Sequence, residues 1–128
     1  LSAHHYFREF AFCDSGMIPF LLVLQLLSES KKSLSELIDE RATKFISSGE
    51  VNLIVENHKE AVNRVFNHFK KEALEIESLD GLSMLFKNWR FNLRSSNTES
   101  IVRLNIETKG KMGLLNRRTK EISKIVLS

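Results

Sequence analysis

The stretch DGLSMLFKNWRFNLRSSNTESIVRLNIE, residues 80–107, decides the fold, because it contains three segments in which apolar and polar residues alternate. The alternating apolar residues are Leu82, Met84 and Phe86, then Trp89, Phe91 and Leu93, and finally Val102, Leu104 and Ile106. A period of two predicts strands with one buried face. Because the turns between these segments are short, the strands are predicted to pair in the antiparallel sense.

Further predicted elements flank this stretch on both sides. GEVNLIV, residues 49–55, alternates in the same way and predicts a fourth strand. Asn57-His58-Lys59-Glu60 is a helix-capping signal, and a final helix is predicted from about residue 113 to residue 127. The order strand, helix, three strands, helix predicts an α+β two-layer sandwich, in which two helices cover a four-stranded antiparallel sheet.

The sequence of the N-terminal part predicts two helices. MIPFLLVLQLL, residues 17–27, is apolar nearly all round, so we expect a helix that is buried on most sides. Its 11 residues fall short of the roughly 20 that a membrane span needs, so no membrane segment is predicted. Ser33 to Glu36 form a capping box that opens a second helix. Ile46-Ser47-Ser48-Gly49 predicts a linker after that helix.

Length and charge restrict the classes of function. The 128 residues suffice for one domain with a sizeable core but not for two. The net charge of +3 fits an anionic ligand and is far below that of a dedicated nucleic-acid arm. The single cysteine excludes an internal disulfide, which favours a reducing, cytoplasmic setting. The chain begins at Leu1 rather than Met, which indicates a piece of a larger protein.

The loop between the second and third alternating segments is the first candidate site. If the apolar residues of both strands face the core, Arg94 and Arg103 face outward. Between them, Ser96, Asn97 and Thr98 offer two hydroxyls and a carboxamide. Proteins bind phosphate with hydrogen-bond donors grouped around a guanidinium, so a phosphate-binding loop is one interpretation. The other is an ordinary polar hairpin loop with solvated arginines.

The segment SAHHYF, residues 2–7, is the second candidate site. Adjacent histidines on a strand point to opposite sides, so His4 and His5 form a poor metal pair, and no metal site is predicted. One histidine could act as a general acid or base, with Ser2 as a hydroxyl contact. A structural or surface histidine is the other interpretation.

Several of these segments resemble one known family. SAHHYFREFAFCDSGMIPFLL, GEVN and DGLSMLF-x-x-WRFNLRSSNTE-x-x-VRLN-x-E are similar to the C-terminal part of the bacterial phosphomannomutase/phosphoglucomutase family, in the α-D-phosphohexomutase superfamily. The resemblance covers essentially the whole chain and implies a four-domain parent enzyme. Residues 1–30 would then end the third, sugar-binding domain, residues 31–49 would form the connection and hinge, and residues 50–128 would be the C-terminal phosphate-binding domain.

The resemblance also implies roles for individual residues. The loop that binds the phosphate not undergoing transfer is matched by Arg94, Ser96, Asn97 and Thr98. Ser2 matches a residue of the sugar-recognition loop, and His4 matches a position near the reacting hydroxyl, where a histidine has been considered for proton transfer. Arg103 matches a common arginine of the following strand, either in a supporting role or in direct contact with the substrate.

The activity that the resemblance implies is the interconversion of mannose 6-phosphate and mannose 1-phosphate through a bisphosphorylated hexose. Mg²⁺ would be a cofactor of the parent enzyme with ligands outside this chain, and the chain alone is expected to be inactive. The expected partners are hexose phosphates and the remaining domains of the parent, with neither nucleic acid nor membrane. Residues 17–27 are expected to self-associate in the isolated chain. The alternative is a non-enzymatic, anion- or nucleic-acid-binding α+β module.

Overall fold

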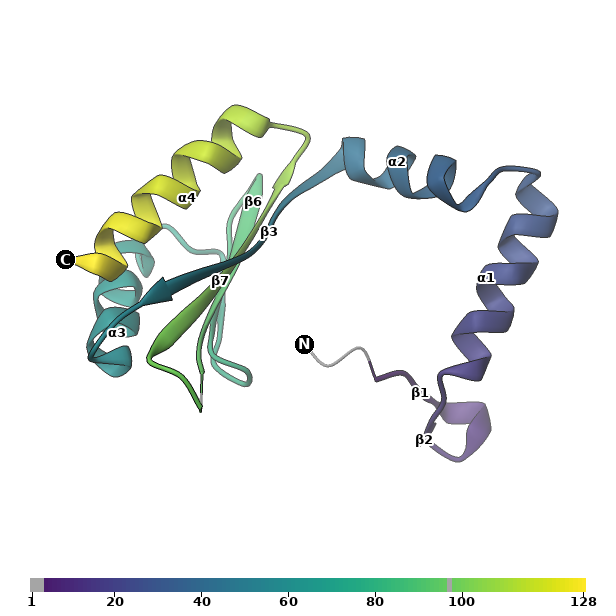
Figure 1. The fold of residues 1–128 in the computed structure, drawn as a ribbon, viewed down its shortest axis with the longest axis horizontal. Helices are drawn as coiled ribbons and strands as arrows, with labels where there is room; N and C mark the ends of the chain where they lie inside the picture. Colours follow the sequence, from purple (N-terminus) through teal and green to yellow (C-terminus); the bar gives the residue numbers. More distant parts are fainter. Residues whose placement is uncertain (1–3, 97) are drawn as a thin grey trace. The chain divides into compact units, whose positions relative to one another are not determined.

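The structure is a computed structural model of the chain, and it describes residues 4–96 and 98–128. The chain divides into two compact units, Leu1–Arg41 and Ala42–Ser128. Figure 1 shows both units as a ribbon, with most of their helices and strands labelled.

The first unit contains a short hairpin followed by helices. Its elements are β1 (Tyr6–Phe7), the 3-10 helix η1 (Arg8–Phe10), β2 (Cys13–Asp14), α1 (Met17–Ser30) and the start of α2 (Leu34–Lys44). The strands β1 and β2 pair antiparallel, with Tyr6 opposite Asp14. The predicted capping box of α2 is confirmed. Ser33 Oγ accepts a hydrogen bond from the Glu36 N–H, and the Glu36 carboxylate accepts one from the Ser33 N–H.

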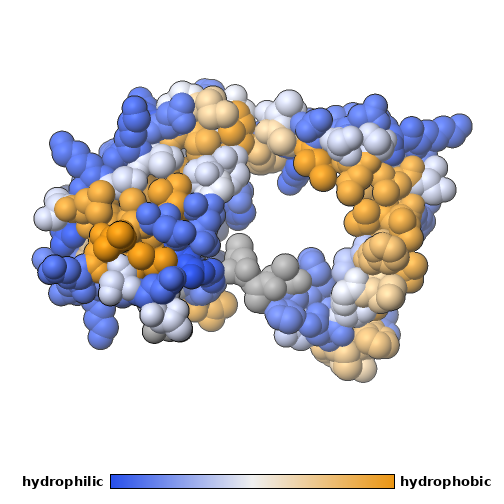
Figure 2. Space-filling model, viewed as in Figure 1, coloured by the Kyte–Doolittle hydropathy of each residue, from blue (hydrophilic) through white to orange (hydrophobic). Residues whose placement is uncertain are grey.

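Helix α1 leaves its apolar side chains exposed. None of its residues is buried, and Phe20 and Leu22 each keep 54% of their surface exposed. Figure 2 shows apolar side chains along α1. The prediction that this helix is buried on most sides is therefore wrong for this chain, because such burial needs neighbours on several sides. Among the described residues, none of the helices combines the length and the apolar content needed to cross a membrane.

The second unit is a five-stranded sheet with two helices. Its elements are β3 (Phe45–Ile54), α3 (His58–Phe69), β4 (Glu75–Glu77), β5 (Leu82–Leu85), β6 (Trp89–Ser95), β7 (Ile101–Lys109) and α4 (Met112–Leu127). The strand order is β3-β7-β6-β5-β4, and all neighbouring strands pair antiparallel. Figure 1 shows α3 and α4 on the same side of this sheet. The predicted α+β class is confirmed.

The core lies between the sheet and these two helices. All nine alternating apolar residues of the 80–107 stretch are buried, as are Leu53 and Val55 of β3. The helices contribute buried side chains that include Val65, Phe69, Leu115, Ile122 and Val126. The side chains that alternate with the buried ones on β6 and β7 lie on the opposite face. The strand register that buries the apolar side chains therefore also determines which side chains lie on the opposite face of the sheet.

Strand β4 is the one strand of the main sheet that the sequence pattern missed, and it makes this sheet five-stranded rather than four-stranded. Its three residues, Glu75, Ile76 and Glu77, are all exposed and pair with β5 at the edge of the sheet. Because no face of β4 is buried, its sequence lacks the apolar alternation by which the other strands were predicted.

Residues 46–49, which were predicted as a linker, belong to β3. This strand pairs with β7 from Phe45 opposite Lys109 onward, and the register shifts between Ser47 and Glu50. Ser47 lies opposite Glu107 and Glu50 lies opposite Asn105, so β3 holds one residue more than β7 at this point and forms a β-bulge. Gly49, with a φ of +65°, supplies the unusual backbone conformation. Small and polar residues suit a bulge as well as a linker, and the sequence signal did not separate the two.

The turn before β5 is held tightly against β6. Gly81 has a φ of +77°, and a Cβ at this position would lie 2.6 Å from the Leu93 carbonyl oxygen and 2.8 Å from the Arg94 Cα. Both are backbone atoms, which cannot move aside as the end of a flexible side chain can. The Asn92 side chain also donates a hydrogen bond of 2.8 Å to the Asp80 carbonyl oxygen. Glycine at position 81 therefore allows Asp80 to lie beside Arg94.

We expect Gly81→Ala to destabilise the second unit by about 1–3 kcal/mol, because alanine is strained at positive φ and its Cβ meets the β6 backbone. Urea unfolding followed by the fluorescence of Trp89, the single and buried tryptophan, measures the change. The matched control is Gly113→Ala, where an added Cβ meets nothing within 4 Å in helix α4. That variant should be stabilised by about 0.5–1 kcal/mol. Equal effects of the two substitutions would contradict this account of the turn.

Candidate functional site

Arg94 and Arg103 are direct neighbours on the face of the sheet opposite the helices. They are register partners on β6 and β7. Their sequence neighbours Leu93, Val102 and Leu104 are fully buried, so alternation turns both arginines outward, as predicted. The exposed fractions of the two side chains are 32% and 31%. Like charges directly opposite each other on paired strands are unfavourable, so this pair requires anions close by.

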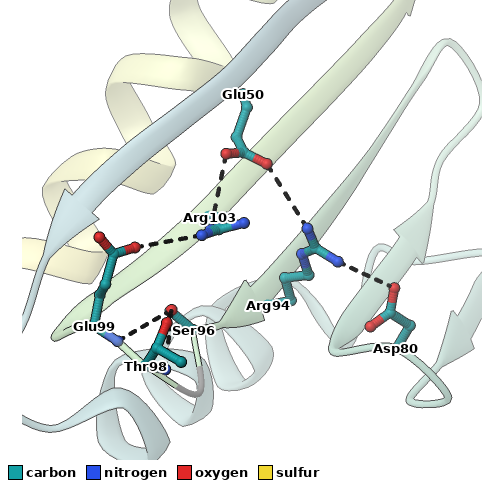
Figure 3. Close-up of polar contacts among 7 residues, drawn as sticks. All are labelled: Glu50, Asp80, Arg94, Ser96, Thr98, Glu99 and Arg103. Carbon is teal, nitrogen blue, oxygen red and sulfur yellow. Dashed lines mark hydrogen bonds and ion pairs between the residues drawn. The ribbon is translucent and has the colours of Figure 1, made fainter. Parts of the chain in front are cut away.

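Three carboxylates supply the negative charge around the two arginines (Figure 3). Glu50 on β3 bridges both of them, with one oxygen 3.8 Å from Arg94 and the other 3.8 Å from Arg103. Asp80 lies 3.7 Å from Arg94, and Glu99 lies 3.3 Å from Arg103. Three carboxylates against two guanidiniums leave this cluster with one excess negative charge.

Most of these ion pairs are loose. The two contacts of Arg94 and the contact of Arg103 with Glu50 are longer than hydrogen bonds, whereas Arg103 donates one hydrogen bond to Glu99. The Nε atom of Arg103 is buried and has no hydrogen-bond partner among the described residues. A buried donor without an acceptor is rare in folded proteins. The contacts of Arg94 with Glu50 and Asp80 are too long for hydrogen bonds, so its guanidinium keeps hydrogen-bonding capacity that an added acceptor could use.

The loop between β6 and β7 is organised by Ser96. Its hydroxyl accepts hydrogen bonds from the N–H groups of Thr98 and Glu99, at 3.4 and 3.2 Å, and its own N–H donates to the Ile101 carbonyl at 3.0 Å. The hydroxyls of Ser96 and Thr98 are 3.5 Å apart. These internal hydrogen bonds use the three N–H groups and hold the Ser96 and Thr98 hydroxyls in a tight turn next to Arg94. Hydroxyls beside a guanidinium can serve as hydrogen-bond donors to an anion.

The structure brings together four of the residues predicted for the phosphate site, namely Arg94, Ser96, Thr98 and Arg103. Asn97 and Ser2 lie outside the described residues. The carboxylates Glu50, Asp80 and Glu99 were not predicted as part of this site. The sequence showed Asp80 only as a turn residue and Glu50 only as part of GEVN, because their approach to the arginines depends on strand register.

His4 of the first unit is paired with Asp14. Its Nδ1 atom lies 2.5 Å from an Asp14 carboxylate oxygen, and the His5 backbone N–H donates to the other oxygen at 3.1 Å. The hairpin explains the contact, because the pairing of Tyr6 with Asp14 returns the chain to the start of β1. The hydrogen bond from His4 holds the pKa of Asp14 below its ordinary value, and the His5 N–H acts in the same direction. A carboxylate that accepts from Nδ1 orients the ring and leaves Nε2 for other contacts.

Within residues 4–96 and 98–128, no group of three or more His, Cys, Asp or Glu side chains is arranged to hold a metal ion. The resemblance implies magnesium ligands that lie outside this chain, and that expectation stays a prediction.

Comparison with known proteins identifies the family. Residues 1–45 match the family described as phosphoglucomutase/phosphomannomutase, alpha/beta/alpha domain III, and residues 50–125 match the phosphoglucomutase/phosphomannomutase C-terminal domain. The chain belongs to the phosphoglucomutase/phosphomannomutase family. Membership includes both the segment with His4 and the segment with Arg94.

Individual relatives agree with this assignment. A protein named "Phosphohexose mutases" from Xanthomonas campestris pv. campestris (strain B100) is 53% identical over 126 residues, which cover 98% of this chain and 28% of that protein. A phosphomannomutase from Escherichia coli (strain K12) is 52% identical over 122 residues, which cover 95% of this chain and 27% of that protein. The chain thus spans less than a third of the length of these relatives.

One solved structure, that of a phosphoglucomutase/phosphomannomutase family protein from Burkholderia thailandensis, is similar to part of this chain. The alignment covers 63% of this chain and 17% of the chain in that structure. The TM-score is 0.49 and the sequence identity is 23%.

We expect an NMR titration to place the pKa of the Asp14 carboxyl below its ordinary value. Since the pKa is lowered in the folded state, the stabilising contact with His4 is fully present above the unfolded-state pKa. It is lost as the pH falls through the lowered value. His4→Gln should move the pKa of Asp14 back toward its ordinary value.

Glu36 is an internal control for this titration. Its pKa is lowered by hydrogen bonds from Ser33, so it should not respond to the substitution at position 4. An Asp14 pKa that is the same with and without the imidazole would show that the contact does not hold in solution.

Proposed function

We propose that this chain is the C-terminal part of a phosphomannomutase that interconverts mannose 6-phosphate and mannose 1-phosphate, and that its Arg94 loop binds the phosphate that is not transferred. The observation that carries the proposal is the pair of outward arginines beside the Ser96 turn. The family membership of the chain supports the class of reaction. Residues 1–30, 31–49 and 50–128 are the proposed end of the sugar-binding domain, hinge and phosphate-binding domain.

Each residue of the loop has a chemical task in this proposal. The Arg94 guanidinium would donate two parallel hydrogen bonds to phosphate oxygens, which is the strongest contact available to such an anion. The Ser96 and Thr98 hydroxyls and the Asn97 carboxamide would donate to the remaining oxygens. Arg103 would support the loop through its ion pair with Glu99 or would contact the phosphate directly.

The first unit would contribute to the reacting end of the sugar. His4 is proposed as the acid or base near the reacting hydroxyl, and Asp14 would hold its ring in place. Ser2 is proposed to contact the sugar. The chain would be inactive alone, because the phosphate-carrying group and the ligands of Mg²⁺ would belong to other parts of the parent enzyme.

The reaction itself explains why such a loop is needed. The phosphate moves between O6 and O1 through a bisphosphorylated hexose, so the sugar binds in two orientations. Whichever phosphate is idle must be held at a fixed place while the other reacts. A loop that contacts only phosphate oxygens can perform this task in both orientations. Hexose phosphates and the remaining domains are thus the proposed partners, in the cytoplasm.

Helix α1 fits the same proposal. Its apolar side chains, exposed in this chain, would be covered by the rest of the third domain in the parent protein. In the isolated chain, residues 17–27 would instead self-associate.

We expect Arg94→Ala in the full-length parent to lower kcat/KM for mannose 1-phosphate by about 10- to 100-fold, because a charged hydrogen-bonding partner of the phosphate is lost. The matched control is Arg90→Ala. Arg90 lies on the same strand and the same face, but its guanidinium already donates two hydrogen bonds of 3.0 and 2.9 Å to the Glu107 carboxylate. Steady-state kinetics of the control should stay within about threefold of the wild type.

Near-normal kinetics of the Arg94 variant would show that this loop does not bind the substrate phosphate. Salt-sensitive binding of DNA or RNA by the isolated chain, unaffected by Arg94→Ala, would favour the non-enzymatic module instead.

A further inference from the structure

The register of β3 after its β-bulge turns Glu50 toward the arginines. From Glu50 to Ile54 the strand pairs regularly with β7, and Glu50 lies opposite Asn105. Beyond the bulge, Leu53 and Val55 are buried in the core, and Glu50 has the opposite orientation. Alternation along this part of β3 therefore places the Glu50 carboxylate beside the site.

Glu50 is the one residue of the cluster that contacts both arginines. One carboxylate oxygen lies 3.8 Å from Arg94 Nη2, and the other lies 3.8 Å from Arg103 Nε. The Arg103 Nε atom is the buried donor without a hydrogen-bond partner. Glu50 is thus close enough to offset the repulsion between the two guanidiniums, yet it does not occupy their hydrogen-bond donors.

The same face of the sheet offers a direct comparison. The Arg90–Glu107 pair also joins β6 to β7, but it closes with two hydrogen bonds of 3.0 and 2.9 Å. That pair raises the pKa of Arg90 through the hydrogen bond with Glu107. A closed pair of this kind is geometrically feasible on this sheet. The loose contacts of Glu50 leave both arginines available to another anion.

We propose that Glu50 is a displaceable counter-ion of the phosphate site, which stabilises the Arg94–Arg103 pair when the site is free and weakens the binding of phosphate. This inference rests on the proposed function of the loop. An incoming phosphate dianion is attracted by two guanidiniums and repelled by the carboxylate that bridges them. Glu50 consequently lowers the affinity and speeds release, which a substrate that must leave and rebind in a second orientation requires.

Glu50→Gln tests this role, because glutamine keeps the shape of the side chain and removes its charge. At a high effective dielectric and a separation of a few ångströms, removing one negative charge should tighten the binding of inorganic phosphate by about three- to tenfold. The affinity is measured by titrating phosphate into the ¹⁵N-labelled 128-residue chain and following the amide signals of Ser96 and Thr98.

Two further variants separate charge from structure. Glu50→Asp keeps the charge and should stay within about twofold of the wild-type affinity. Glu72→Gln removes a charge from an exposed position just after α3, in the helix layer, and should leave the affinity unchanged. A purely structural role of Glu50 would instead weaken binding in Glu50→Gln, because the arginines would be less well held.

The outcomes are distinct. Tighter binding in Glu50→Gln alone supports the counter-ion role. Unchanged or weaker binding in Glu50→Gln overturns it, even when the wild-type chain binds phosphate. If phosphate shifts neither amide signal in any of the proteins, the proposed phosphate loop itself is wrong and the counter-ion role is lost with it.

Discussion

Two positive charges directly opposite each other on paired strands are the constraint around which this sheet is built. Arg94 and Arg103 meet because Leu93, Val102 and Leu104 must be buried on the other face. A slip of either strand by one residue would expose that strand's apolar side chains and bury its arginine. The core thus holds the charges together, at an electrostatic cost that nearby carboxylates offset.

Three separate parts of the second unit deliver those carboxylates. The alternation of β3 after its bulge turns Glu50 toward the pair, the glycine turn at position 81 brings Asp80 against β6, and the loop itself supplies Glu99. Each device is a local backbone feature with its own sequence requirement. Their common effect is a site whose cations are neutralised but only partly hydrogen-bonded. Such a site is suited to binding an anion reversibly rather than permanently.

Much of this arrangement could be predicted from the sequence. The three alternating segments of residues 80–107 gave strands, the face of each strand and the outward direction of Arg94 and Arg103, because burial leaves a period-two pattern. The capping signal at Asn57 was also correct, since its side chain accepts the Glu60 N–H at 3.2 Å. A helix cap involves residues close together in the sequence, and a strand repeats its alternation over several residues, so both leave a pattern in the sequence.

Other features could not be read from the chain alone. Strand β4 buries no face, so it carries no alternation. The Ser-Ser-Gly signal could not distinguish a linker from a bulge, and that distinction determines where β3 begins. The pairing of His4 with Asp14 depends on hairpin register, and the apolar pattern of α1 predicted burial although this chain leaves it exposed. Each of these features depends on contacts with residues that lie elsewhere in the sequence, and a local pattern does not record such contacts.

The central claim is that Arg94, held beside Arg103, binds the substrate phosphate, and the NMR signals of the arginine Nε–H groups test it most directly. Titration of the chain with mannose 1-phosphate should shift the signals of Arg94 and Arg103 together, along one binding curve. The signal of Arg90, closed by Glu107 on the same face, should stay in place. Equal shifts of all three arginines, or no shift at Arg94, would contradict the account.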